Sequence, residues 1–272
     1  IEARTTLTGP DARLEAEVLM EAICAISRSR QFSHADDQLA ADQVEKYRCA
    51  LQRRITGEPL AHITALRGFW DMDLQVTPDV LIPRPDTEIL VEQALERIPR
   101  DASWQIADLG TGSGAIAIAV ARERSQCNLT AIDNSPAALA IAKQNAIALG
   151  VNNINFIAGS WGQSLENRFF DMILSNPPYI RDDDPHLAEG DLPAEPEQAL
   201  VSGSDGLDAI RQIITDSSTC LKPGGWLLLE HGFEQASEVV DLLQHHDFNE
   251  IFTEKDYAGI DRVTGGKRQF EG

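Results

Sequence analysis

A polar tetrapeptide follows an apolar run near the middle of the chain: Asn176, Pro177, Pro178 and Tyr179 come directly after Met172–Leu174. Neither proline can donate a backbone hydrogen bond, so the pair marks the exit of a strand rather than its interior. The Asn176 side-chain oxygen and the Pro177 carbonyl are acceptors, and together they can hold the two N–H groups of a planar nitrogen. Because that arrangement favours positive charge on an otherwise poor nucleophile, the tetrapeptide indicates chemistry on an amide or exocyclic amine.

A glycine-rich turn lies upstream of the tetrapeptide, and its residues are Asp108, Leu109, Gly110, Thr111, Gly112, Ser113 and Gly114. Glycines at the end of a strand let backbone amides approach a ligand closely. Asp133 follows 23 residues after Gly110, at the spacing of an acid that binds a ribose. This pattern predicts an adenosine-containing cofactor, but it also fits a dinucleotide, and Asp133 could instead cap the helix beginning at Pro136.

Alternating strands and helices must position these residues. Apolar runs predict strands at 105–109, 128–133, 153–158, 170–175, 225–231, 248–253 and 262–268. Helical spacing predicts helices at 87–98, 115–123, 136–149, 207–221 and 234–245. We therefore expect an α/β fold with a mostly parallel seven-stranded sheet, in which ligands bind beyond the carboxyl ends of the strands.

Two domains joined by a connector are expected along the chain. Residues 1–56 have helical periodicity and predict a small helical domain that positions a substrate, whereas 57–85 alternates in short runs typical of a hairpin-like connector. Residues 86–272 form the predicted catalytic domain. The stretch from Tyr179 to Gly206 has no clear periodicity, and a loop of that length is usually functional or disordered.

The charge of the chain argues against a protein that binds phosphate backbones. The formal net charge is −20, and the segment from Asp182 to Asp208 contains no Lys or Arg. That acidic run is either a solvated loop or a docking surface for a basic partner. Four dispersed cysteines without a C-x-x-C pair indicate neither a zinc site nor a disulfide framework, and we expect no metal, no membrane span and a cytoplasmic location.

These motifs together resemble one enzyme family. The 108–114 turn resembles motif I of class I S-adenosylmethionine-dependent methyltransferases, and 176–179 resembles their N-P-P-Y motif. With 81–88, 57–59, 195–196 and 230–232, the set is similar to the HemK/PrmC family across nearly the whole chain. The resemblance implies a Rossmann-like domain that methylates the glutamine amide nitrogen (N5) in the Gly-Gly-Gln motif of peptide-chain release factors, which modulates translation termination and leaves S-adenosyl-L-homocysteine.

The same resemblance assigns roles to individual residues. Residues 110–114 would wrap the methionine part of the cofactor and Asp108 would also bind it, Asp133 would hold its ribose, and Trp161 would lie against its adenine. Asn176, which also borders the cofactor, and the residues up to Tyr179 would hold the substrate glutamine. Where the family commonly has an acid before that tryptophan, this chain has Ser160, which puts one contact to the adenine amino group in doubt.

Several roles and functions stay open from the sequence alone. Arg84 and Thr87 are candidate site residues, but Arg84 could be a surface ion-pair partner and Thr87 a helix cap. The N-P-P-Y motif also suits adenine N6 in DNA or RNA, although the acidity of the chain disfavours direct nucleic-acid binding. The glycine turn is also compatible with an NAD-dependent oxidoreductase or with a nucleotide-binding scaffold that has no activity. We expect a monomer.

Overall fold

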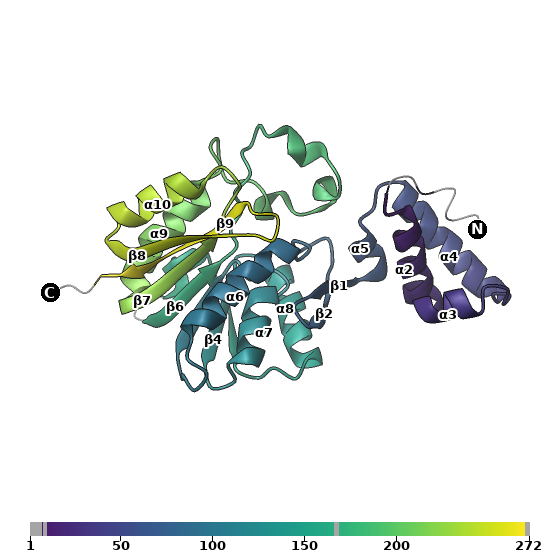
Figure 1. The fold of residues 1–272 in the computed structure, drawn as a ribbon, viewed down its shortest axis with the longest axis horizontal. Helices are drawn as coiled ribbons and strands as arrows, with labels where there is room; N and C mark the ends of the chain where they lie inside the picture. Colours follow the sequence, from purple (N-terminus) through teal and green to yellow (C-terminus); the bar gives the residue numbers. More distant parts are fainter. Residues whose placement is uncertain (1–6, 8–9, 166–168, 270–272) are drawn as a thin grey trace. The chain divides into compact units, whose positions relative to one another are not determined.

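The computed structural model describes residues 7, 10–165 and 169–269, which fall into two compact units (Figure 1). One unit comprises the described residues up to Leu66 together with Ala188–Ala194, and the other comprises Arg67–Leu187 and the residues from Glu195 onward, apart from those not described. No helix within the described part of the chain is both long and apolar enough to cross a membrane.

The first unit is a group of helices around a small apolar core. Its helices are α2 (Ala12–Cys24), α3 (Arg28–Ser33), α4 (Ala41–Ile55) and α5 (Leu60–Thr64). Leu19 of α2 packs with Tyr47 of α4 and Ile63 of α5 because each falls on the apolar side of its helix. Tyr47 also donates a hydrogen bond to the Ala16 carbonyl at 3.1 Å, which satisfies its hydroxyl inside this core.

The second unit begins with a two-stranded hairpin, β1 (Leu66–Phe69) and β2 (Met72–Gln75), and the short helix η1 (Pro85–Thr87). The larger sheet contains β3 (Gln105–Leu109), β4 (Asn128–Asp133), β5 (Ile154–Ala158), β6 (Phe170–Ser175), β7 (Leu221–Glu230), β8 (Phe248–Lys255) and β9 (Asp261–Arg268). Its helices are α6 (Glu88–Arg97), α7 (Ala115–Glu123), α8 (Pro136–Ala148), η2 (Trp161–Leu165), α9 (Asp208–Cys220) and α10 (Ala236–His245).

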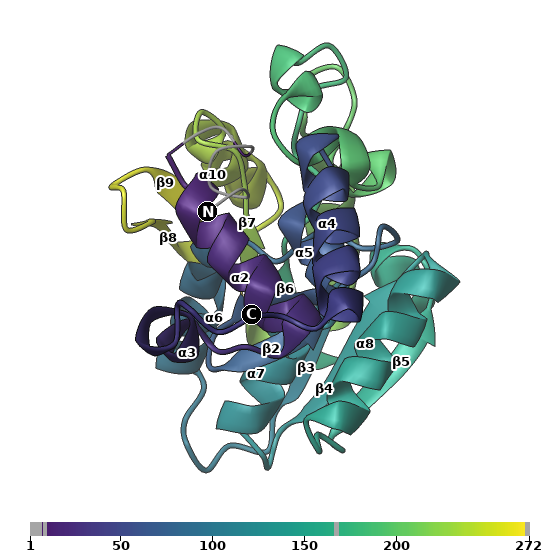
Figure 2. The same cartoon turned by 90° about the vertical axis from the view of Figure 1, so that its right-hand side faces the viewer.

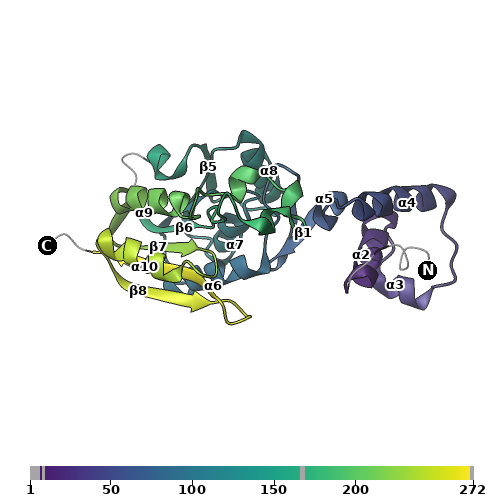
Figure 3. The same ribbon diagram turned by 90° about the horizontal axis from the view of Figure 1, so that it is seen from above.

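The strand order in the larger sheet is β5-β4-β3-β6-β7-β9-β8, and β9 runs antiparallel to the other six strands. Figures 2 and 3 show β5 and α8 toward one edge of the sheet and β8 toward the other. The expected mostly parallel seven-stranded α/β sheet is thus confirmed. The order reverses between β3 and β6, so ligands of such sheets are expected where these two strands end.

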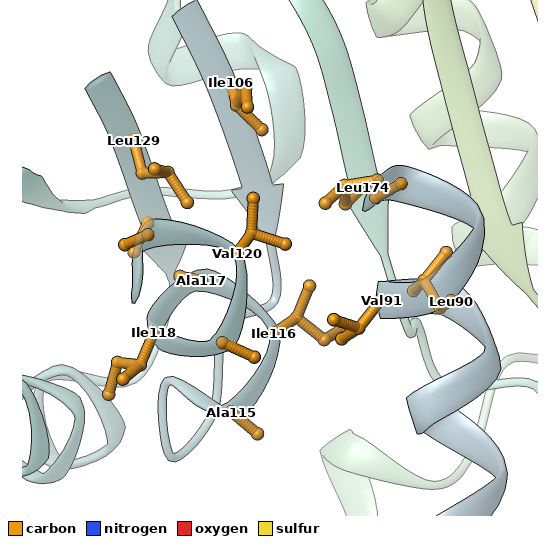
Figure 4. Close-up of a cluster of buried hydrophobic side chains, with 14 of the residues drawn as sticks. Leu90, Val91, Ile106, Ala115, Ile116, Ala117, Ile118, Val120, Leu129 and Leu174 are labelled. Carbon is orange, nitrogen blue, oxygen red and sulfur yellow. The ribbon is translucent and has the colours of Figure 1, made fainter. Parts of the chain in front are cut away.

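Strand residues alternate between two helix layers. Met172 and Leu174 of β6 belong to the core under α6 and α7, whereas Ile173 between them belongs to the core under α9 and α10. This alternation follows from the two-residue period of a strand. Figure 4 shows the first of these cores, where α6 and α7 side chains meet Ile106, Leu129 and Leu174 from three strands. Both faces of the sheet are therefore covered, which leaves its carboxyl edge for the site.

The aperiodic segment after Tyr179 is largely turns. It contains the one-turn helices η3 (Pro185–Ala188), η4 (Leu192–Ala194) and η5 (Glu197–Ala199). An isolated bridge between Ile180 and Val201 joins the two ends of the segment. The segment is therefore a loop closed at its base.

Candidate active site

The glycine turn leaves the carboxyl end of β3 in conformations that need glycine. Gly110, Gly112 and Gly114 have φ values of +74°, +54° and +86°. The amides of Gly110 and Thr111 both donate to the Ile132 carbonyl at 2.9 Å, which fixes the turn against β4. A Cβ on Gly112 would meet no atom within 4 Å, so open space adjoins the turn at that position.

Asp108 lies beneath this turn and is fully buried. Its Oδ2 accepts hydrogen bonds from the Thr111 hydroxyl at 2.6 Å and from the Ala117 amide at 3.2 Å. Its Oδ1 has no partner among the described residues. Burial raises the pKa of Asp108 to about 7, against the lowering effect of these two hydrogen bonds. An unpaired oxygen of a buried carboxyl group is a position where a ligand donor or a water molecule would be stabilised.

Asp133 at the end of β4 faces the same turn. Its Oδ2 accepts from the Gly112 amide and its Oδ1 from the Ser135 amide, both at 2.9 Å. The helix cap itself is provided by Ser135, whose hydroxyl accepts from the Ala138 amide. Burial raises the pKa of Asp133. Because a carboxylate has about four acceptor positions, Asp133 can still accept from a hydroxyl group of a ligand.

Asn145 on α8 holds the turn from behind, and sequence reasoning missed it. Its Nδ2 donates to the carbonyls of Gln75 and Ser113 at 3.0 and 2.9 Å, and its Oδ1 accepts from the Gln75 amide at 2.8 Å. Asn145 is buried, yet one side chain satisfies three backbone groups from β2 and the glycine turn. Asn145 is a polar residue on the otherwise apolar side of the predicted 136–149 helix, and this position could have indicated that it makes buried hydrogen bonds.

A pocket opens where β3, β4 and β6 end. The described residues that line it are Asp79, Val80, Leu81, Gly110, Gly112, Asp133, Asn134, Ser135, Ala138, Gly159, Ser160, Trp161, Asn176, Pro178, Pro196, Gln198 and Ala199. Six of the predicted residues therefore line one pocket, namely Gly110, Gly112, Asp133, Trp161, Asn176 and Pro178, whereas Asp108, Pro177 and Tyr179 do not line it. Thr111, Ser113 and Gly114 lie behind its wall, because the first two are buried and Gly114 packs against Ile118 and Ala142.

Trp161 forms one side of this pocket. It has a left-handed backbone conformation with φ +48°, which is uncommon for a residue other than glycine. Its ring lies near Gly110, where an added Cβ would be 3.2 Å from Cζ3 of the indole. Ser160 lines the pocket beside it. A flat apolar wall therefore stands beside the glycine turn.

The tetrapeptide after β6 is held by two other elements. Nδ2 of Asn176 donates to Oγ1 of Thr87 at 3.0 Å, and the hydroxyl of Tyr179 donates to Oε1 of Glu230 at 3.3 Å. Burial raises the pKa of the Tyr179 phenol, with the Glu230 charge as a second cause. The Thr87 side chain makes no capping hydrogen bond to α6, and its hydroxyl oxygen accepts from Asn176 instead.

Arg84 is paired rather than directed into the pocket. Its guanidinium forms an ion pair with Glu195, whose side chain is fully buried and also accepts from the Ile82 amide at 3.2 Å. Sequence reasoning missed this role of Glu195 because the two partners lie far apart in the chain. The ion pair connects Glu195 of the acidic run 182–208 to the segment before α6. Glu195 directly precedes Pro196, which lines the pocket.

Within the described residues, no group of three or more His, Cys, Asp or Glu side chains is arranged to hold a metal ion. The four cysteines are free thiols.

Two family models match the chain. The methyltransferase small domain matches residues 85–205, and the PrmC N-terminal domain matches residues 2–64. Among curated proteins, the release factor glutamine methyltransferase of Coxiella burnetii is 45% identical over 98% of this chain and 96% of its own length. The protein with the same description from Escherichia coli is 43% identical over 94% of this chain and 92% of its own length.

Solved structures share the fold at low identity. A 16S rRNA methyltransferase from Thermus thermophilus, solved with AdoMet and guanosine, has a TM-score of 0.57 and 19% identity, covering 75% of this chain and 50% of that one. A methyltransferase from Pyrococcus furiosus has a TM-score of 0.55 and 14% identity, covering 80% and 98%. These neighbours have the expected class I methyltransferase fold.

Proposed function

The chain belongs to the family of release factor glutamine methyltransferases, and from this membership we propose that it transfers a methyl group from S-adenosylmethionine to the glutamine side-chain amide of a peptide-chain release factor. The resemblance to the HemK/PrmC family is thereby confirmed. The observation that carries the proposal is the position of Asn176, which lines one pocket together with Gly112 and Asp133.

The pocket residues fit the methyl donor. The open space beside Gly112 would take the methionine part, and the acceptor capacity that Asp133 retains would hold the ribose hydroxyls. Trp161 supplies an apolar face for adenine. Asp108 is buried and does not line the pocket, and its unpaired Oδ1 could accept from a water molecule beneath the bound donor. S-adenosylmethionine supplies an electrophilic methyl group bound to a sulfonium.

The protein's own contribution is to orient the amide that receives the methyl group. Oδ1 of Asn176 and the Pro177 carbonyl accept the two N–H groups of the glutamine side chain, and Tyr179 and Pro178 flank its plane. As positive charge develops on the nitrogen, both acceptors interact with it more strongly, which lowers the barrier. The methylated nitrogen is strongly acidic and loses a proton to water, so the mechanism needs no dedicated base.

The expected partner is a release factor acting in a reducing cytoplasm. Four unpaired cysteines support such a compartment. The adenine-N6 alternative is disfavoured by the net charge of −20, since a nucleic-acid enzyme usually presents basic surface. The curated relatives described as release factor glutamine methyltransferases align with this chain over almost their full lengths.

The test is mass spectrometry of a release factor after incubation with the protein and S-adenosylmethionine. We expect a gain of one methyl group on the Gly-Gly-Gln glutamine, and no gain when that glutamine is replaced by alanine. Asn176→Ala should slow transfer by about 100-fold or more at saturating donor, as the loss of one preorganised charge-stabilising group typically does. Asn152→Ala is the matched control, because Asn152 is an exposed residue outside the pocket.

One outcome would contradict this function, and another would contradict the role of Asn176. Label from the donor appearing in nucleic acid rather than in release factor would support the adenine alternative. Full activity of Asn176→Ala would show that the amide is not held by this side chain.

A further inference from the structure

Gln235, directly before α10, makes three hydrogen bonds with one side-chain amide. Its Oε1 accepts from the Gly232 amide at 2.8 Å, and its Nε2 donates to the carbonyls of Tyr179 and Asp205 at 3.1 and 3.4 Å. Because a backbone N–H only donates and a carbonyl only accepts, these partners fix which end of the Gln235 amide faces which group. One side chain thus joins the segment after β7, the last residue of the tetrapeptide and the acidic run 182–208.

Two glycines pack against the Gln235 amide. An added Cβ on Gly232 would lie 3.0 Å from Oε1 of Gln235 and 3.6 Å from Cδ2 of the Tyr179 ring. One on Gly206 would lie 2.7 Å from Nε2 and would overlap the Tyr179 carbonyl oxygen. The absence of side chains at both positions therefore gives the amide its space. Gln235 is not among the described residues that line the pocket, so its effect on chemistry passes through the groups that it holds.

The tetrapeptide has little conformational freedom before Tyr179. The rings of Pro177 and Pro178 fix two φ angles, and each ring also restricts the ψ angle of the residue before it. The side chain of Asn176 is held separately, by its hydrogen bond to Thr87. Tyr179 follows the second proline and has no such restriction of its own backbone. Its position relative to Asn176 and Pro177 therefore depends on its contacts.

Tyr179 is held at its hydroxyl and at its carbonyl. The hydroxyl donates to Oε1 of Glu230 at 3.3 Å, which is long for a hydroxyl donor and therefore weak. The peptide group between Tyr179 and Ile180 is held on both sides, because its N–H donates to the Leu200 carbonyl at 2.9 Å and its carbonyl accepts from Gln235. Without Gln235, this peptide group could tilt about its remaining hydrogen bond, and the Tyr179 ring would move with it.

We propose that Gln235 is a positioning residue that holds Tyr179 beside the substrate amide, and that it thereby sets the rate of methyl transfer without touching the reacting groups. This inference rests on the proposed function, in which Tyr179 flanks the plane of the glutamine amide that Asn176 and Pro177 accept. A ring that moves away leaves this amide free to turn out of line with the methyl group. A displacement of about 1 Å in a reacting group can lower the rate about 100-fold.

The variants Gln235→Met and Gln235→Glu remove the bridge in different ways. Methionine has a similar length without the N–H donors, and glutamate keeps an acceptor for the Gly232 amide but has no donor for the two carbonyls. We expect kcat for the Gly-Gly-Gln release factor to fall about tenfold to 100-fold in both, with the affinity for S-adenosylmethionine unchanged. Gln244→Ala is the matched control, because Gln244 is an exposed residue of α10 outside the pocket. Wild-type kcat in folded Gln235→Met would overturn the proposal.

A double-mutant cycle with Tyr179→Ala separates positioning from general damage. Tyr179→Ala removes the ring that Gln235 is proposed to hold. Adding Gln235→Met to it should therefore lower kcat further by less than about threefold, since residues that act as one unit are not additive. If Gln235 only stabilised the fold, the two losses would be independent. Losses in kcat that multiply would count against the positioning role.

The wild-type protein provides a measurement that needs no variant. The two side-chain amide protons of Gln235 are each accepted by a carbonyl, so they should exchange with solvent at least about tenfold more slowly than those of exposed Gln244. Equal exchange rates would show that the bridge is absent in solution and would refute the inference. A wild-type protein that methylates no release factor would instead refute the proposed function and leave the exchange result unaffected, so the two failures are distinguishable.

Discussion

Alanine substitutions at three glycines separate the cofactor role of the turn from its structural role. Gly112, Gly114 and Gly150 all have positive φ, at +54°, +86° and +69°. An added Cβ would meet nothing within 4 Å at Gly112 or Gly150. At Gly114 it would lie 2.9 Å from Cδ1 of Ile118 and 3.3 Å from Cα of Ala142. The three sites therefore share a backbone penalty and differ in their surroundings.

The expected loss of stability follows from these contacts. A left-handed conformation costs an L-residue about 1–2 kcal/mol, so Gly112→Ala and Gly150→Ala should each lower the free energy of unfolding by about that amount. Gly114→Ala adds overpacking against a backbone atom that cannot move freely, which costs about a further 1–3 kcal/mol. We expect a total of about 2–5 kcal/mol for Gly114→Ala, a large part of typical domain stability.

Urea denaturation and calorimetry with S-adenosylmethionine measure the two effects independently. Gly112→Ala should match Gly150→Ala in the free energy of unfolding but bind the methyl donor at least tenfold more weakly, because its methyl group projects into the pocket that Gly112 lines. Gly150→Ala should bind the donor as the wild-type protein does. Equal donor affinity in these two variants would refute the assignment of the turn to the cofactor. A stability of Gly114→Ala equal to that of Gly150→Ala would refute the packing argument.

Three further predictions concern charge. The pKa of Asp108 is raised from 3.8 to about 7, so its contribution to folding is present at low pH and is lost as pH rises toward about 7. Between pH 5 and 8 Asp108 should account for a fall of roughly 2–3 kcal/mol in wild-type stability, and in urea denaturation Asp108→Asn should lack that part of the slope while the part from buried Glu230, whose pKa is also raised to about 7, remains. Arg84→Ala should lower the free energy of unfolding by about 3 kcal/mol, because it leaves buried Glu195 without its cation. Adding Glu195→Gln should recover most of this loss, and unchanged stability of Arg84→Ala would contradict the prediction. Affinity for a release factor should weaken between low and high salt if the acidic run 182–208 docks it, and an unchanged dissociation constant would remove that role.

Much of the second unit could be predicted because its elements have strong local patterns. The expected strands 105–109, 128–133 and 170–175 match β3, β4 and β6, since each is an apolar run bounded by polar or glycine residues. The expected start of β7 at Gly225 was wrong, because the strand begins at Leu221. Pro223 and Gly224 indicated a break, but a register shift opposite β6 accommodates them within the strand.

The remaining errors have a common physical origin. The helix α5 (Leu60–Thr64) was missed because five residues are too few to establish a helical period. The roles of Glu195 and Asn145 depend on partners more than 30 residues away in the chain, and no local pattern encodes such contacts. Sequence spacing thus located the ends of strands, where the pocket forms, but not the side chains that hold those ends in place.

The three hydrogen bonds of Asn145 have a consequence for local motion. Because the Gln75 amide proton is held by the same side chain that holds the Ser113 carbonyl, it can exchange with solvent only when the Asn145 amide leaves its place. Release of the hairpin strand and loosening of the glycine turn are therefore parts of one opening event. The exchange rate of a single backbone proton, on a strand outside the pocket, reports how rigidly the cofactor turn is held.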